Sequence, residues 1–264
     1  MMIPVDGGEL AFEAVGSGPA VLFLHAFPLS SAMWVPQAAA LSGDHRVVRF
    51  DDRGFGGSTV GSGPLTMDRI ADDAVAVLDH LSIDRAVVCG CSMGGYAAFA
   101  LMRRAPARVR ALVLIDTKAS PDTEEGRAGR AALAQKVTAQ GSVAAAEAML
   151  PKLLGPTSHR ERPALVARVR SWILETPPAA IANAALGLGA REDSRPTLAT
   201  IRVPTLIVRG EEDGIITADD ARELNNGIVG SRLVTIAAAG HLPNLEEGPR
   251  IEETLARFLR DLPA

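Results

Sequence analysis

In the sequence VVCGCSMGGYAAF at residues 87–99, a serine lies among three glycines between an apolar run and a helical pattern. Residues 90–94 match G-x-S-x-G, and this context predicts the sharp strand-to-helix turn called a nucleophile elbow. Such a turn strains the serine backbone and brings strand and helix so close that neighbouring side chains would collide. We therefore expect Gly90 and Gly94 to make room, and the Ser92 hydroxyl to project above the sheet.

Short apolar runs recur along the chain and predict the sheet. Continuous apolar runs of this length are typical of parallel strands that are buried on both faces. Helical patterns at 66–81, behind a Thr66 N-cap, and at 249–262 lie between or after them. This alternation predicts an α/β fold with a mostly parallel sheet, helices on both faces and the active site at the carboxyl ends of the strands. The expected strands are 20–24, 46–50, 86–90, 111–116, 205–210 and 232–237.

One interval interrupts this alternation. About ninety residues between the fourth and fifth expected strands contain no convincing strand and are rich in Ala and Arg. A structureless loop of that length is improbable in a compact domain, so we expect several helices that form a small cap. The predicted organisation is a core of residues 1–117 and 198–264, with a helical cap at 118–197 inserted between core strands.

Composition limits the classes of binding partner and indicates the cellular compartment. The chain has 264 residues and a net charge of −4, and neither sign of charge gathers into a block, which argues against nucleic acid. The chain begins with no signal-peptide pattern and contains no apolar run of about 18 residues, so we expect a cytoplasmic protein that does not enter the membrane. Cys89 and Cys91 are expected to pack in the core. The oligomeric state is left open, with a homo-oligomer among the alternatives.

A serine nucleophile needs a histidine base, and the chain contains five histidines. His241, in AAAGHLPNLEEGP, follows the last expected strand and precedes the last helix, which places it at the carboxyl edge of the sheet. His25 closes the first expected strand on the same edge; we favour a structural role in holding the loop AFPLSS, with a role as the base as the alternative. The remaining histidines are expected to be solvated: His45, His80 and His159.

The acid of the site is sought among residues that follow strands. Asp213 in TLIVRGEEDGII is the preferred candidate, because the order Ser92, Asp213, His241 reproduces the Ser, Asp, His order of α/β-hydrolases. Asp116, at the end of ALVLID, also lies on this edge and is the alternative. Glu211 and Glu212 are expected to be solvated.

With these residues in place, the chain resembles the α/β-hydrolase superfamily, specifically its small cap-bearing serine esterases and 3-oxoadipate enol-lactonase-like members. The likeness rests on HAFPLSSAMWVPQ (25–37), DDRGFGGS (51–58), GCSMGGY, GEED and GHLPNLEE. It implies that Ser92 is the nucleophile, Asp213 the acid and His241 the base, with the backbone N–H groups of Phe27 and Met93 as the oxyanion hole.

Two details of the resemblance concern loops. Ala26 stands where the family commonly has glycine, and its methyl group restricts the backbone beside the first oxyanion donor. In the second loop, Asp51 and Arg53 are expected to anchor the turn through hydrogen bonds. Three aromatic residues are candidates for lining a substrate pocket, with core packing as the alternative for each: Trp34, Tyr96 and Trp172.

The resulting prediction is a serine hydrolase that cleaves carboxylic esters or lactones of small substrates through an acyl-enzyme intermediate. Neither a metal nor an organic cofactor is expected, because no helix carries paired histidine ligands and no G-x-G-x-x-G follows the first strand. Dehalogenases and epoxide hydrolases share the fold but use an aspartate nucleophile, so Ser92 argues against both. The alternatives are a cofactor-free perhydrolase, in which peroxide replaces water, and a receptor-like binding protein with slow or no turnover.

Overall fold

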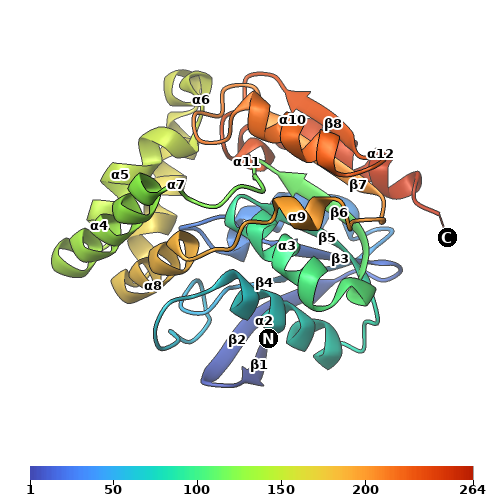
Figure 1. Ribbon diagram of the computed structural model, residues 1–264, viewed down its shortest axis with the longest axis horizontal. Coiled ribbons are helices and arrows are strands. Elements are labelled where there is room, and N and C mark those ends of the chain that lie inside the picture. Colours follow the sequence, from blue (N-terminus) through green and yellow to red (C-terminus); the bar gives the residue numbers. More distant parts are fainter. Residues whose placement is uncertain (264) are drawn as a thin grey trace.

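A mixed, mostly parallel sheet of eight strands forms the centre of the protein (Figure 1). The computed structural model describes residues 1–263. Its strands are β1 Met2–Val5, β2 Gly8–Val15, β3 Ala20–Leu24, β4 Arg46–Phe50, β5 Ala86–Cys91, β6 Val109–Ile115, β7 Thr205–Gly210 and β8 Arg232–Ile236. They lie in the order β1-β2-β4-β3-β5-β6-β7-β8; β2 is antiparallel to both of its neighbours and every other pair is parallel.

The structure confirms the predicted α/β fold, and the six predicted strands are β3 to β8. β3 and β5 are buried along their whole length, as expected for central parallel strands covered on both faces. The hairpin of β1 and β2 was not predicted. Buried and exposed side chains alternate in parts of β2, and Glu9 and Glu13 interrupt its apolar residues, so this edge strand lacks a continuous apolar run.

Helices cover both faces of the sheet. α1 and α12 pack against each other. In a second group of helices, α3 packs against α2 and α9, and α9 packs against α10. α3, α9 and α10 lie in front of the sheet in Figure 1. The Thr66 hydroxyl accepts a hydrogen bond from the Arg69 N–H at 3.2 Å, which confirms the predicted N-cap of α2. The bounds are α1 Val35–Leu41, α2 Met67–His80, α3 Met93–Arg104, α9 Arg195–Leu198, α10 Ala218–Gly227, α11 Pro243–Glu246 and α12 Gly248–Arg260, with 3-10 turns at Ser31–Trp34 and Pro106–Arg108.

Five helices form the insert between β6 and β7, at the left of Figure 1. α4 packs against α8 and α5, and α5 packs against α7. The Leu65 N–H donates to the Asn183 carbonyl at 3.0 Å, which attaches α8 to the loop before α2. No helix within residues 1–263 is both long enough and apolar enough to span a bilayer. The helices of the insert are α4 Glu124–Gln140, α5 Val143–Leu153, α6 Pro156–Glu161, α7 Pro163–Glu175 and α8 Pro178–Gly189.

Candidate active site

Ser92 lies at the turn between β5 and α3, in the strained backbone conformation that the sequence predicts. Its φ is 51° and its ψ is −109°, a region that costs a non-glycine residue about 1 to 3 kcal/mol. A Cβ atom at Gly90 would lie 2.3 Å from the Gly94 carbonyl oxygen, and one at Gly94 would lie 2.3 Å from the Leu24 carbonyl oxygen. The expected steric role of both glycines is thereby confirmed.

His241 joins Ser92 to Asp213. Its Nε2 lies 2.8 Å from the Ser92 Oγ, and its Nδ1 lies 2.8 Å from the Asp213 Oδ2. All three side chains are buried, with Ser92 retaining 9% of its surface exposed. A neutral imidazole that donates from Nδ1 to Asp213 accepts the hydroxyl proton at Nε2, which is the arrangement a general base requires.

Asp213 is held by backbone N–H groups as well as by His241. Its Oδ1 accepts hydrogen bonds from the Ile215 N–H at 2.7 Å and the Ile216 N–H at 3.1 Å. Burial opposes ionisation, but the charge and hydrogen bond of His241 and these further donors outweigh it and lower the pKa of Asp213. The carboxyl group is therefore suited to stabilise a charged imidazole.

Asp116, the alternative acid, lies beside Asp213 but makes no hydrogen bond to His241 within the described residues. It follows β6 with φ at 43°, and the Gly210 N–H donates to its Oδ1 at 2.9 Å. Asp213 is close enough for its charge to act on this carboxyl. Burial and the nearby Asp213 charge raise the pKa of Asp116 well above its usual range, whereas the pKa of Asp213 is lowered.

Two backbone N–H groups were expected to form the oxyanion hole. Met93 is the first residue of α3, so its N–H has no partner within the helix and lies at the positive end of the helix dipole. Within residues 1–263 the Phe27 N–H has no hydrogen-bond acceptor in the protein. Ala26 is not among the described residues with positive φ, so its methyl group requires no left-handed backbone.

His25 forms a second buried pair of a histidine and an aspartate, with Asp52, and has a structural role there. Its Nδ1 lies 3.1 Å from the Ala26 carbonyl oxygen, and its Nε2 accepts a hydrogen bond from the Asp52 N–H at 3.0 Å. The predicted contact with the AFPLSS loop is present, but His25 also holds the 51–58 loop. Burial raises the pKa of the Asp52 carboxyl from 3.8 to about 6, with the nearby His25 acting in the opposite direction.

The 51–58 loop is anchored by Asp51 and Arg53, as expected. Asp51 accepts hydrogen bonds from the Ser31 N–H at 2.8 Å and the Gly57 N–H at 2.9 Å. Arg53 donates two hydrogen bonds of 2.7 Å to Asp73 on α2. These contacts connect the loop to the first turn before α1 and to α2.

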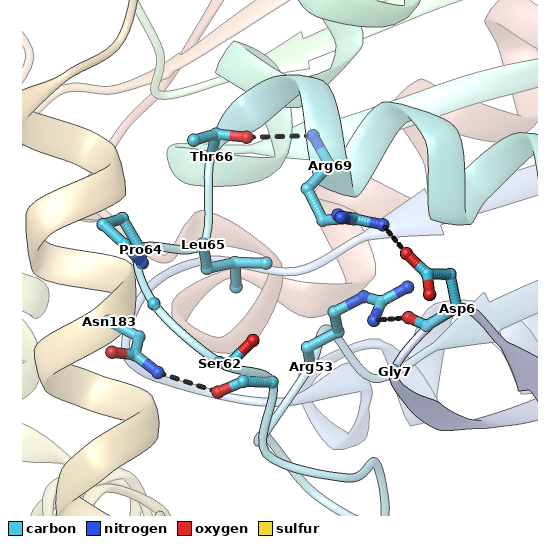
Figure 2. A pocket seen from close by; sticks show the side chains of 11 residues that line it. Asp6, Gly7, Arg53, Ser62, Pro64, Leu65, Thr66, Arg69 and Asn183 are labelled. Atoms are coloured by element: carbon cyan, nitrogen blue, oxygen red, sulfur yellow. Dashed lines mark hydrogen bonds and ion pairs between the residues drawn. The ribbon is translucent and has the colours of Figure 1, made fainter.

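A polar cavity of about 320 Å³ lies beside Arg53, between the β1–β2 turn, the start of α2 and α8 (Figure 2). Arg53 donates to the Asp6 carbonyl, and Arg69 lies 3.5 Å from the Asp6 carboxylate. The Asn183 amide donates to the Gly61 carbonyl at 3.1 Å. None of the residues that line this cavity belongs to the Ser92 site, and several of their polar groups pair with one another.

Two glutamates near the site were missed. Glu212 was expected to be solvated, but it is half-buried and accepts hydrogen bonds from the Thr157 N–H at 2.9 Å and hydroxyl at 2.6 Å. Glu246 is 1% exposed and binds backbone N–H groups beside His241. Its place in the motif GHLPNLEE, five residues after His241, is the signal that could have indicated it.

The three candidate pocket aromatics occupy different environments. Trp34 is fully buried and stacks on Phe23 of β3 at 4.6 Å, which is the core alternative. Tyr96 is buried under the Arg191 guanidinium, 4.4 Å from the ring centroid. Trp172 is half-buried on α7 of the insert. Within residues 1–263 no group of three or more His, Cys, Asp or Glu side chains has the arrangement of a metal site.

The chain belongs to the α/β-hydrolase fold family, whose model matches residues 19–248. It is 30% identical to 3-oxoadipate enol-lactonase 1 of Acinetobacter baylyi, over 97% of this chain and 95% of that protein. A solved thermophilic esterase from Thermogutta terrifontis is 38% identical, with a TM-score of 0.94 over 97% of this chain and 94% of that one. The enol-lactonase from Burkholderia xenovorans LB400 is 32% identical, with a TM-score of 0.92 over 99% and 100%. These likenesses place the protein with hydrolases of the esterase and lactonase branch.

Proposed function

We propose that the protein is a serine hydrolase that cleaves carboxylic esters or lactones of small substrates through an acyl-enzyme. The observation that carries this proposal is the continuous line of contacts from Ser92 through His241 to Asp213, with 2.8 Å at each step. Relatives named as esterases and enol-lactonases support the same class of bond.

In the first half-reaction His241 accepts the Ser92 proton at Nε2 while the Ser92 oxygen attacks the carbonyl carbon. The N–H groups of Phe27 and Met93 receive the negative charge that develops on the carbonyl oxygen. The ester C–O bond then breaks, and the proton on His241 passes to the departing alkoxide oxygen. With a lactone substrate the alcohol stays covalently attached to the acyl group.

In the second half-reaction water replaces the alcohol. His241 takes a proton from water, the resulting hydroxide attacks the acyl carbon, and Ser92 recovers its proton as the acid leaves. Asp213 holds the imidazole in the tautomer that both halves need and stabilises the imidazolium.

The test is a panel of p-nitrophenyl acetate, p-nitrophenyl butyrate and small lactones, with Ser92→Ala as the matched control. Turnover that disappears in Ser92→Ala supports the proposal, and the ratio of kcat/KM values assigns the esterase or lactonase class. Saturable binding of esters and lactones without turnover by the wild-type protein would contradict it and favour a receptor-like role.

A further inference from the structure

Glu246 lies in α11 and is buried, with only 1% of its surface exposed. Its Oε1 accepts hydrogen bonds from the Gly240 N–H at 2.9 Å and the Leu242 N–H at 3.2 Å. Its Oε2 accepts a hydrogen bond from the Gly155 N–H at 2.7 Å. One side chain therefore satisfies three backbone donors from two distant segments.

Two of those donors flank the base. Gly240 and Leu242 are the residues on either side of His241, so Glu246 fixes the peptide on each side of the histidine. Asp213 fixes the imidazole ring at Nδ1, but the ring can meet Ser92 only if its backbone stays in place. A displacement of about 1 Å in a reacting geometry can cost about 10²-fold in rate.

The third donor belongs to the insert. Gly155 lies between α5 and α6, and its backbone packs directly on the His241 loop: a Cβ atom at Gly240 would lie 2.2 Å from the Gly155 nitrogen. Glu212, next to Asp213, adds a second link by accepting hydrogen bonds from the N–H and hydroxyl of Thr157. The start of α6 is thus hydrogen-bonded to Glu246, which also binds the loop of His241, and to Glu212 in the loop of Asp213.

We propose that Glu246 is a positioning residue for His241, which it holds in register with Ser92 by fastening the Gly240–Leu242 segment to the insert at Gly155. This inference rests on the proposed function of His241 as the base. It also couples the two parts of the protein: a displacement of the α5–α6 turn is transmitted to the base.

The test compares Glu246→Gln with Glu247→Gln. Glutamine has a single acceptor oxygen, so it can serve the His241 loop or Gly155 but not both. Glu247 is the matched control because its side chain also binds the insert, through Arg162, yet within residues 1–263 it forms no hydrogen bond to residues 240–242. Two readouts are used: kcat and KM for p-nitrophenyl butyrate, and amide hydrogen exchange of peptides that cover residues 153–158 and 239–243.

For Glu246→Gln we expect kcat to fall about 10- to 100-fold with KM within about threefold, and exchange to become faster in both segments. Glu247→Gln should stay within about twofold in kcat and leave both segments protected. Unchanged kcat and exchange in folded Glu246→Gln, or equal losses in both variants, would overturn the proposal. If Glu246→Gln does not fold, Glu246→Asp, whose shorter side chain cannot span both segments, replaces it with the same expectations.

The exchange measurement does not require catalysis. If the wild-type protein hydrolyses no ester or lactone, the proposed function fails, whereas faster exchange in both segments of Glu246→Gln would still support the link between them. If the wild-type protein is active and Glu246→Gln retains full kcat, the role of Glu246 in positioning the base fails and the proposed function stands.

Discussion

Asp116 and Asp213 lie side by side at the ends of adjacent strands, yet only Asp213 hydrogen-bonds to His241. Burial and the Asp213 charge raise the pKa of Asp116, whereas His241 and backbone donors overcome burial and lower the pKa of Asp213. A raised pKa favours the protonated form of Asp116, and a protonated carboxyl can donate a hydrogen bond to a neighbouring carboxylate.

Asp213→Asn should lower kcat about 10³- to 10⁴-fold, because an amide no longer selects the productive histidine tautomer or stabilises the imidazolium. Hydrolysis of p-nitrophenyl butyrate measures the loss, and circular dichroism checks that the fold is intact. Near-normal kcat in this variant would transfer the role of the acid to Asp116.

Asp116→Asn should keep kcat within about tenfold of wild type. An amide can accept from the Gly210 N–H and donate to Asp213, as a protonated carboxyl does. Asp116→Ala, which leaves the Gly210 donor unsatisfied, should lower the free energy of unfolding by about 1 to 3 kcal/mol in urea titrations. A kcat for Asp116→Asn as low as that of Asp213→Asn would mean that catalysis needs an ionised Asp116.

His25→Ala should damage activity less than His241→Ala. His25 touches Ala26 and Asp52 and acts by holding loops, so we expect a loss of at most about 10²-fold in kcat. His241→Ala removes the base and should cost more than about 10³-fold. Steady-state kinetics of the two variants gives the ranking, and the reverse order would make His25 the base.

Asp52→Asn should become more stable relative to wild type as pH rises from about 4 to 7. The pKa of Asp52 is 3.8 in the unfolded chain and about 6 in the folded one. Its contribution to the free energy of unfolding is therefore fully present below pH 3.8 and is lost as the pH rises through about 6. The difference in unfolding free energy should change by about 2 to 3 kcal/mol between urea titrations at pH 4 and pH 7. A difference that does not vary with pH would refute this account of Asp52.

Gly90→Ala should lower the free energy of unfolding by about 2 kcal/mol or more, because the added methyl group meets the Gly94 backbone at 2.3 Å. Gly43→Ala is the matched control, since a Cβ atom there meets nothing within 4 Å, and it should change stability by about 0.5 kcal/mol or less. Thermal and urea unfolding of both variants test the difference. Equal stabilities would mean that strand and helix are not in close contact at the elbow.

Sequence patterns predicted the central sheet because each buried parallel strand is a continuous apolar run, as in β3 and β5. The same patterns did not predict β1 and β2, because the partly exposed residues of these strands form no continuous apolar run. The elbow was predictable because glycine spacing, strand and helix signals coincide around Ser92, and its observed φ of 51° agrees with that interpretation.

Residues whose partners are backbone groups were harder to predict. Asp116 and Asp213 both follow strands and both lie between Ser92 and His241 in the chain, so chain order cannot choose between them, and only the fold decides which meets His241. The N–H groups bound by Glu246 and Glu212 belong to segments up to 91 residues away. No side-chain spacing encodes such contacts. From the sequence alone, therefore, Glu246 is assigned no role and Glu212 is expected to be solvated.

We propose Ser92, activated by His241, as the nucleophile. Reaction of the protein with a fluorophosphonate, followed by location of the adduct by mass spectrometry, tests this assignment. We predict one phosphonyl group per chain, on Ser92, with labelling slowed at least about 10³-fold in His241→Ala. An adduct on another residue, or unchanged labelling of Ser92 in His241→Ala, would contradict the account.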